Sequence, residues 1–266
     1  MKRFIWYSDT HMNLSVLPFM KRLYVMRLKK ESADGLFITG DISSGGWLES
    51  DLRFLARNFP GPIYFVLGNH DYHGRHVESV HADIRRICSE YSNLNWMTEK
   101  GVVSLNEDVA LIGAEGWYDG EAGDPDLLFW TLDRFLTFDF LHLSSMDERV
   151  ALWRSMATHA AQTVAAKLEE ALTTHKTVYV LTHFPPWEEA TKTAGATRDL
   201  WLSYNTNVAM GAAIEEVMRG RKKKRVVVLA GHTHAPCRIR VTNSIECHVA
   251  RASYLGKISP EQTIII

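Results

Sequence analysis

The stretch Ile-Tyr-Phe-Val-Leu-Gly-Asn-His-Asp, residues 63–71, joins a short apolar run directly to a cluster of polar side chains. Ile63–Leu67 is apolar and contains β-branched and aromatic residues, a composition that favours a buried β-strand. Gly68 follows, and its missing side chain lets the backbone turn sharply. An amide, an imidazole and a carboxylate come next without a spacer, which predicts a functional site at the carboxyl end of this strand.

Short apolar runs and longer amphipathic segments alternate along the rest of the chain. The other predicted strands are Phe4–Tyr7, Leu36–Thr39, Val109–Gly113, Thr177–Leu181 and Val226–Ala230. Segments with apolar residues at three- and four-residue steps predict helices over Pro18–Glu31, Trp47–Asn58, His76–Tyr91 and about 147–174. This alternation predicts an α/β domain. Near the C-terminus, a closing antiparallel portion is expected from the short apolar pieces Ile239–Val241, Ile245–Val249 and Thr263–Ile266.

We predict a single domain over residues 1–266, because the length suits one large domain and no domain boundary is visible. Two aromatic-rich stretches, at about 116–146 and 184–206, are predicted to be irregular insertions. Loops of this length in a compact domain are often functional, and a poorly ordered linker is the plain alternative. Their aromatic residues suit two roles equally, stacking on a base or aryl group of a ligand or filling the core; these residues are Trp117, Tyr118, Trp187 and Trp201.

The composition excludes several classes of protein. With 30 basic and 31 acidic residues the formal net charge is −1, which argues against a general attraction to nucleic acid or to a membrane surface. A basic run at residues 219–225 could attract a polyanion, but a solvated turn is the favoured interpretation. No apolar run reaches the ~18 residues of a transmembrane helix. The three cysteines form no CxxC pair, so a reducing compartment, the cytoplasm, is expected.

Metal-capable side chains follow five of the six predicted strands. They occur in Ser8-Asp9-Thr10-His11, Gly40-Asp41, Gly68-Asn69-His70-Asp71, Thr182-His183 and Gly231-His232-Thr233-His234. The carboxyl ends of strands in an open α/β sheet form the ligand crevice, so we expect these distant residues to converge.

Carboxylate, imidazole and amide donors predict two divalent metal ions, with Mn²⁺ favoured and Fe²⁺, Zn²⁺ or Co²⁺ as alternatives. No cysteine joins the set to indicate a thiolate site. A carboxylate can bridge two cations ~3.5–4 Å apart, where a shared water becomes hydroxide near neutral pH. Asp41 is the natural bridge.

The five blocks, in this order, resemble the signature of the calcineurin-like metallophosphoesterase superfamily, and the chain is most similar to its bacterial phosphodiesterase-type members. The resemblance implies two stacked mixed β-sheets flanked by helices, a four-layer αββα sandwich. It implies that one metal is held by Asp9, His11, Asp41 and His234, and the second by Asp41, Asn69, His183 and His232. It also implies that His70 contacts the phosphate and the leaving oxygen, as a general acid or an electrostatic clamp.

The resemblance therefore predicts a binuclear phosphoesterase that hydrolyses a small phosphate ester by attack of a metal-bridging hydroxide, with a phosphodiester slightly favoured. Protein serine/threonine phosphatases have Asp-Arg-Gly after the Gly-Asp block, whereas Ile42-Ser43-Ser44 follows Asp41 here, so a phosphoprotein substrate is not expected. The alternatives are a phosphomonoesterase, a nuclease and a non-catalytic metal-binding scaffold. Nucleic acid is the less favoured partner, no membrane partner is expected, and the oligomeric state stays open.

Overall fold

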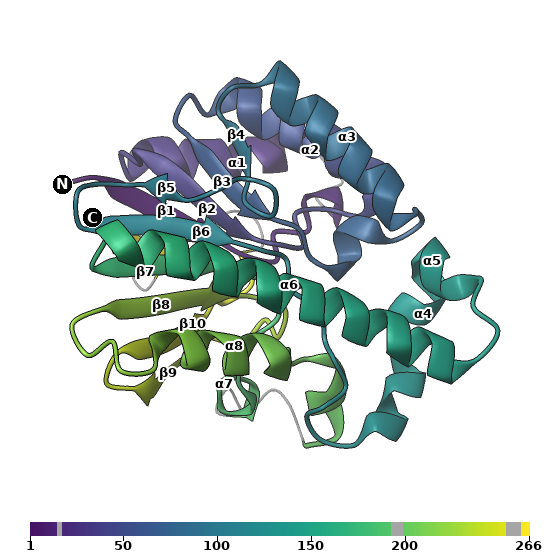
Figure 1. Cartoon of the computed structure of the whole chain (residues 1–266). Coiled ribbons are helices and arrows are strands. Elements are labelled where there is room, and N and C mark those ends of the chain that lie inside the picture. Colours follow the sequence, from purple (N-terminus) through teal and green to yellow (C-terminus); the bar gives the residue numbers. More distant parts are fainter. Residues whose placement is uncertain (15–17, 193–198, 254–261) are drawn as a thin grey trace.

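Two β-sheets stack face to face in the computed structural model, which describes residues 1–14, 18–192, 199–253 and 262–266 (Figure 1). The strands of the first sheet lie in the order β11 (Thr263–Ile265), β1 (Arg3–Tyr7), β2 (Gly35–Thr39), β3 (Ile63–Val66) and β4 (Leu94–Trp96). Those of the second lie in the order β5 (Val103–Ser104), β6 (Val109–Gly113), β7 (Thr177–Leu181), β8 (Arg225–Ala230), β10 (Ile245–Val249) and β9 (Cys237–Thr242).

Both sheets are mixed. Strands β1 to β4 run parallel, and β11 pairs antiparallel with β1. In the second sheet β6, β7, β8 and β10 are parallel, while β5 and β9 add antiparallel edges. The predicted antiparallel closure near the C-terminus is therefore confirmed, with its strands divided between the two sheets.

Helices cover the outer faces of the sheets (Figure 1). On the first sheet these are α1 (Pro18–Lys30), α2 (Gly45–Asn58) and α3 (Val77–Glu90), and on the second α6 (Met146–Thr174) and α8 (Val208–Met218). Successive side chains of a strand point to opposite faces of the sheet, so alternate residues face the helices and the other sheet. Ile5 and Tyr7 pack toward the helices, whereas Phe4 and Trp6 pack between the sheets against Leu181 and its neighbours. The predicted αββα sandwich is confirmed.

The two aromatic-rich stretches contain short helices. The first holds η3 (Pro125–Trp130), α4 (Asp133–Leu136) and α5 (Phe138–Leu141), and the second holds α7 (Glu188–Lys192) and η4 (Asp199–Tyr204). Residues 193–198 of the second stretch lie outside the described residues. Trp117, Tyr118 and Trp187 are buried, so core packing is the interpretation that applies to them, whereas Trp201 is 47% exposed.

Lys167, in the C-terminal half of α6, links this helix to the ends of strands in both sheets. Its ammonium group donates hydrogen bonds to the carbonyl oxygens of Met97, Thr98 and Gly113, at 2.6, 2.8 and 2.9 Å. Met97 and Thr98 follow the end of β4, and Gly113 is the last residue of β6. The Lys167 ammonium group is therefore a shared hydrogen-bond donor for these three carbonyl groups, and it anchors α6 at this point to both sheets.

Replacing Lys167 by Met keeps the apolar stem and leaves three carbonyl groups without their donor. We expect the free energy of unfolding to fall by about 2–4 kcal/mol, because an unsatisfied buried polar group costs ~1–3 kcal/mol. Urea unfolding of the metal-free protein measures this change. Lys176→Met is the control, since the Lys176–Asp108 ion pair is largely exposed and such pairs contribute ~0–1 kcal/mol. Equal effects of the two substitutions would contradict the anchoring role of Lys167.

None of the helices within the described residues combines the length and the apolar character needed to cross a bilayer.

Candidate metal centre

The backbone at the strand ends is left-handed at the residues predicted to bind metal. Among the described non-glycine residues, φ is positive at Asp9 (49°), His11 (40°), Asp41 (50°), His232 (68°), His234 (59°) and, away from the site, Ser32 (50°). Such conformations cost roughly 1–3 kcal/mol each and persist where the surrounding structure enforces them. Five of the six lie in the predicted metal site, and four of these, Asp9, His11, Asp41 and His234, direct a donor atom toward one cluster.

Two glycines make room for the convergence. Gly40 has φ of 89°, and a Cβ there would collide with the imidazole of His183. A Cβ on Gly68 would collide with the carboxylate of Asp41. The close approach of strand ends from the two sheets therefore requires glycine at both positions. Gly68 itself is extended, with φ of −113° and ψ of 179°, so the reason for glycine there is space and not the sharp turn that the sequence suggested.

Four predicted ligands form one compact cluster. Asp9, His11, Asp41 and His234 each present a donor atom, and these atoms all lie within 4.8 Å of one another. His11 Nε2 is 3.4 Å from His234 Nε2 and 3.7 Å from Asp41 Oδ2, and His234 Nε2 is 3.3 Å from Asp9 Oδ1. This cluster is the first ligand set implied by the family resemblance, and the structure brings all of it together.

The remaining predicted ligands lie on the other side of Asp41. His183 Nε2 is 3.4 Å from Asp41 Oδ1 and 3.1 Å from Asn69 Oδ1. The imidazole rings of His183 and His232 are 5.1 Å apart. Asp41 thus has donor atoms near each of its two carboxylate oxygens, His11 beside Oδ2 and His183 beside Oδ1.

Hydrogen bonds orient these predicted ligands. The Nδ1–H group of His183 donates to the carbonyl of Thr39 at 2.8 Å, which leaves Nε2 as the atom that faces the cluster. His232 Nε2 donates to the carbonyl of Tyr204 at 3.2 Å, and this leaves Nδ1 available. The hydroxyl of Ser8 donates to Asp9 Oδ2 at 2.5 Å.

The electrostatics of the cluster suit a cation. Burial lowers the pKa of His11 to about 4 and that of His232 to about 3, so both rings are neutral at neutral pH, as metal ligands must be. Burial, followed by the carboxylates of Asp9 and Asp71, raises the pKa of Asp41. Several buried carboxylates beside neutral imidazoles are an unfavourable arrangement that a divalent cation would stabilise. Oxygen and nitrogen donors without sulfur fit Mn²⁺, Fe²⁺, Zn²⁺ and Co²⁺, so the residues present fit the predicted metals.

His70 lies at the open side of the cluster. Its side chain is 44% exposed, its Nε2 is 3.9 Å from Asp41 Oδ2, and its ring meets that of His11 edge to face. Its backbone N–H donates to Asp41 Oδ1 at 2.9 Å. His70 therefore borders the predicted ligands and faces the solvent from which a substrate would enter.

Asp71 holds the loops around the site. Its carboxylate accepts hydrogen bonds from the backbone N–H groups of Ile42, Ser43 and Gly68, at 3.3, 2.9 and 2.8 Å. The side chain thereby ties the loop after β2 to the loop after β3. The imidazole of His70 is not among these hydrogen-bond partners, so Asp71 acts on the backbone around the ligands.

The family profile described as calcineurin-like phosphoesterase matches residues 2–236. The chain belongs to the calcineurin-like phosphoesterase family. Metal dependence is general to that family, and the cluster of Asp9, His11, Asp41 and His234 is a candidate for its metal site here.

Solved structures share the fold of this phosphoesterase. A phosphopantetheinyl hydrolase from Mycobacterium tuberculosis is similar with a TM-score of 0.64 and 16% identity, over 94% of this chain and 90% of the other. A dimetal phosphatase from Danio rerio is similar with a TM-score of 0.55 and 13% identity, over 94% of this chain and 87% of the other. At these identities the likeness concerns the fold alone. None of the curated proteins matches the sequence.

Asp133 is a residue of the site that the sequence analysis missed. It lies in the first aromatic-rich stretch, and its buried carboxylate accepts hydrogen bonds from Asn69 Nδ2 at 2.9 Å and from His73 Nε2 at 2.7 Å. A carboxylate can only accept, so this contact fixes the amide of Asn69 with its oxygen toward His183. In the sequence Asp133 resembles the other aspartates nearby, Asp124, Asp126 and Asp139, and no local signal distinguishes it.

Replacing Asp133 by Asn should weaken metal binding ~10–100-fold, the usual effect of losing a hydrogen-bond partner of a metal ligand. The physical reason is that an amide at this position can present an N–H to Asn69 and no longer fixes its orientation. Titration calorimetry of the metal-free protein with Mn²⁺ measures the change. Asp126→Asn, at an exposed position in the same stretch, should leave affinity unchanged. Parallel losses in both variants would refute a specific role for Asp133.

Proposed function

We propose that this protein is a binuclear metal-dependent phosphoesterase that hydrolyses a small phosphate ester, with a phosphodiester favoured over a monoester. The observation that supports it most directly is the position of Asp41, whose two oxygens face His11 on one side and His183 on the other. The preference for a diester rests on the resemblance to bacterial phosphodiesterase-type members.

The proposed ligands divide into two sets that share Asp41. Asp9, His11 and His234 complete the first set, and Asn69, His183 and His232 complete the second. Ions held there would supply positive charge to the phosphoryl oxygens and lower the pKa of a coordinated water. The positive-φ backbone at five of these residues supports this assignment, since the strain has no evident use in packing.

His70 is the proposed catalytic residue of this chain. In the proposed role, Nε2 donates a hydrogen bond to the oxygen that leaves phosphorus, at the moment when negative charge develops on it. Two observations support the role. The ring borders Asp41 and His11 from the solvent side. The backbone N–H of His70 donates to Asp41 Oδ1 at 2.9 Å, which fixes the position of the His70 backbone beside the site.

Removal of metal tests the proposal. We expect a chelator to abolish hydrolysis and Mn²⁺ to restore it. The substrates to compare are an aryl phosphate monoester, an aryl phosphodiester, cyclic nucleotides and single-stranded DNA, each with several divalent ions. Hydrolysis that resists chelation, or the absence of hydrolysis with every substrate and metal, would overturn the proposal. Preference for single-stranded DNA with a steep loss of binding between low and moderate salt would favour the nuclease alternative.

A further inference from the structure

An apolar surface of unusual density lies next to the metal centre. Thirteen large hydrophobic side chains are exposed among the described residues, and seven of them fall within residues 129–141. We call these seven the aromatic rim; they are Phe129, Trp130, Leu132, Phe135, Leu136, Phe138 and Leu141. The short helices that carry them project from the body of the molecule beside the start of α6 (Figure 1). Exposed apolar side chains gathered in one segment in this way are typical of a binding site.

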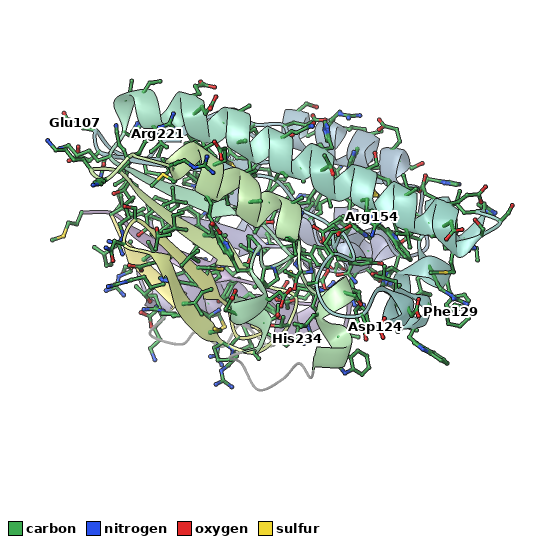
Figure 2. The ribbon with its side chains drawn as sticks, turned by 60° about the horizontal axis from the view of Figure 1, so that its bottom comes forward. Glu107, Asp124, Phe129, Arg154, Arg221 and His234 are labelled. Atoms are coloured by element: carbon green, nitrogen blue, oxygen red, sulfur yellow. The ribbon has the colours of Figure 1, made fainter. Side chains whose placement is uncertain are left out.

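The aromatic rim is held in a defined shape. The guanidinium of Arg134 stacks between two of its rings, 3.8 Å from the centroid of Phe129 and 4.1 Å from that of Phe135. Arg134 also donates a hydrogen bond to the carbonyl of Phe129 at 2.8 Å. Figure 2 shows Phe129 at the outer edge of this part of the molecule. These contacts of Arg134 hold Phe129 and Phe135 in fixed positions relative to each other.

The rim is continuous with the metal centre through the residues between its apolar side chains. Asp133, in the middle of the rim, binds Asn69 and His73. The carbonyl of Leu136 accepts a hydrogen bond from Gly74 N–H at 2.6 Å, and Phe138 N–H donates to the carbonyl of Arg75 at 3.1 Å. The loop that carries His70 is thus hydrogen-bonded to the rim segment at Asn69 and again at residues 73–75.

The other aromatic-rich stretch adds one more exposed apolar side chain, Trp201, near the candidate ligands. Trp201 is 47% exposed on η4, and its ring packs edge to face on Tyr204, 5.4 Å away. The carbonyl of Tyr204 is the acceptor for His232. Segments η3 and η4 also contact each other. Exposed apolar side chains therefore lie on two segments, residues 129–141 and η4, that each hydrogen-bond to a candidate ligand.

We propose that the substrate is an amphiphilic phosphate ester, a single molecule in solution whose phosphate enters the metal centre while its long apolar group packs on the aromatic rim. This inference rests on the proposed phosphoesterase function and names its substrate class. The position of the rim indicates this occupant. Asp133, within the rim segment, is hydrogen-bonded to Asn69 beside His70, so a molecule whose phosphate lies at these residues has the rim within reach of its apolar group.

A chain-length series tests the proposal. One series consists of p-nitrophenyl phosphodiesters with methyl, butyl or octyl as the second ester group, so that the leaving group stays constant. A parallel series of methyl, butyl and octyl phosphates covers monoesters. All are used below the concentration at which they aggregate. We expect kcat/KM to rise ~10-fold or more from methyl to octyl, mainly through KM, because burying even a quarter of seven additional methylenes gives that factor.

Two rim variants and a matched control locate the effect. Trp130→Ser and Leu132→Ser remove the most exposed rim side chains, at 69% and 67% exposure, so both proteins should fold. We expect each to reduce the advantage of octyl over methyl at least threefold, because kcat/KM for the octyl ester falls more than kcat/KM for the methyl ester. Met26→Ser, at a 62% exposed position on α1, should keep the full advantage. Calorimetry with methyl- and octylphosphonate, which are not hydrolysed, should give the same pattern in dissociation constants.

Each other outcome counts against the inference. Hydrolysis of all esters with no dependence on chain length would refute the amphiphilic substrate and leave the phosphoesterase function intact. Hydrolysis of none would remove the function itself. A chain-length effect that appears only above the aggregation point would assign the rim to a lipid surface. A dimer in light scattering that the rim variants convert to a monomer would assign it to contact between copies of this chain.

Discussion

Asp41→Asn should abolish turnover and weaken the binding of both metal ions. Asp41 is the one predicted ligand whose oxygens face both donor sets, at 3.7 Å from His11 and 3.4 Å from His183. An amide has the same shape but carries no charge. If several kcal/mol of transition-state stabilisation depend on this carboxylate, the rate falls ~10³-fold or more, since each ~1.4 kcal/mol is a factor of ten.

The same substitution should not reduce the stability of the metal-free protein. Asp41 is buried beside the carboxylates of Asp9 and Asp71, which raise its pKa. Replacing it by a neutral group removes repulsion between buried charges, so we expect the free energy of unfolding without metal to stay constant or to rise.

Two measurements on Asp41→Asn are needed. Metal analysis after dialysis against Mn²⁺ should show loss of both ions, and urea unfolding in chelator should show no loss of stability. Activity like that of the wild type, or loss of one ion only, would contradict the bridging position. A large loss of stability without metal would mean that Asp41 acts through the fold.

His70→Ala should lower kcat by ~10²–10⁴ while the metal content stays near that of the wild type. The ring lies beside Asp41 and His11 but on the solvent side, so its removal leaves the predicted ligands in place. His159→Ala, which removes an exposed imidazole from α6, is the control and should leave kcat unchanged.

Substrates with different leaving groups distinguish the two roles proposed for His70, a general acid and an electrostatic clamp. A proton donor matters most for an alkoxide, which is a poor leaving group, and least for p-nitrophenolate. We therefore expect a larger loss of kcat with alkyl phosphates than with p-nitrophenyl phosphate. Equal losses would indicate an electrostatic clamp instead of an acid. Loss of both metal ions in His70→Ala would show that His70 is a ligand.

The predicted strands agree closely with the observed ones, and Val109–Gly113 and Thr177–Leu181 have the same bounds in both. These strands are buried on both faces, so each is a continuous apolar run that stands out in the sequence. Strands β4 and β5 were not predicted, because three and two residues are too short to show a period. Their positions depend on pairing with β3 and β6.

His73 shows where sequence reasoning about the site stops. Near the Gly-Asn-His-Asp block it looks like a surface histidine, yet its side chain is 11% exposed and lies 2.7 Å from Asp133. That partner is 60 residues away in the chain and belongs to a stretch whose pattern indicated only an insertion. A contact between two loops leaves no periodic trace in either of them.

Local sequence fixes which side chains follow each strand, because strand formation depends on neighbouring residues: an apolar run ends, and polar side chains of a ligand type come directly after it, behind a glycine at residues 40, 68 and 231. The packing of the folded chain brings these strand ends together from two stacked sheets, imposes left-handed backbone on Asp9, His11, Asp41, His232 and His234, and places Asp133 against Asn69. These features arise from packing between segments far apart in the chain, and packing of that kind is enforced by the whole fold and encoded in no single segment.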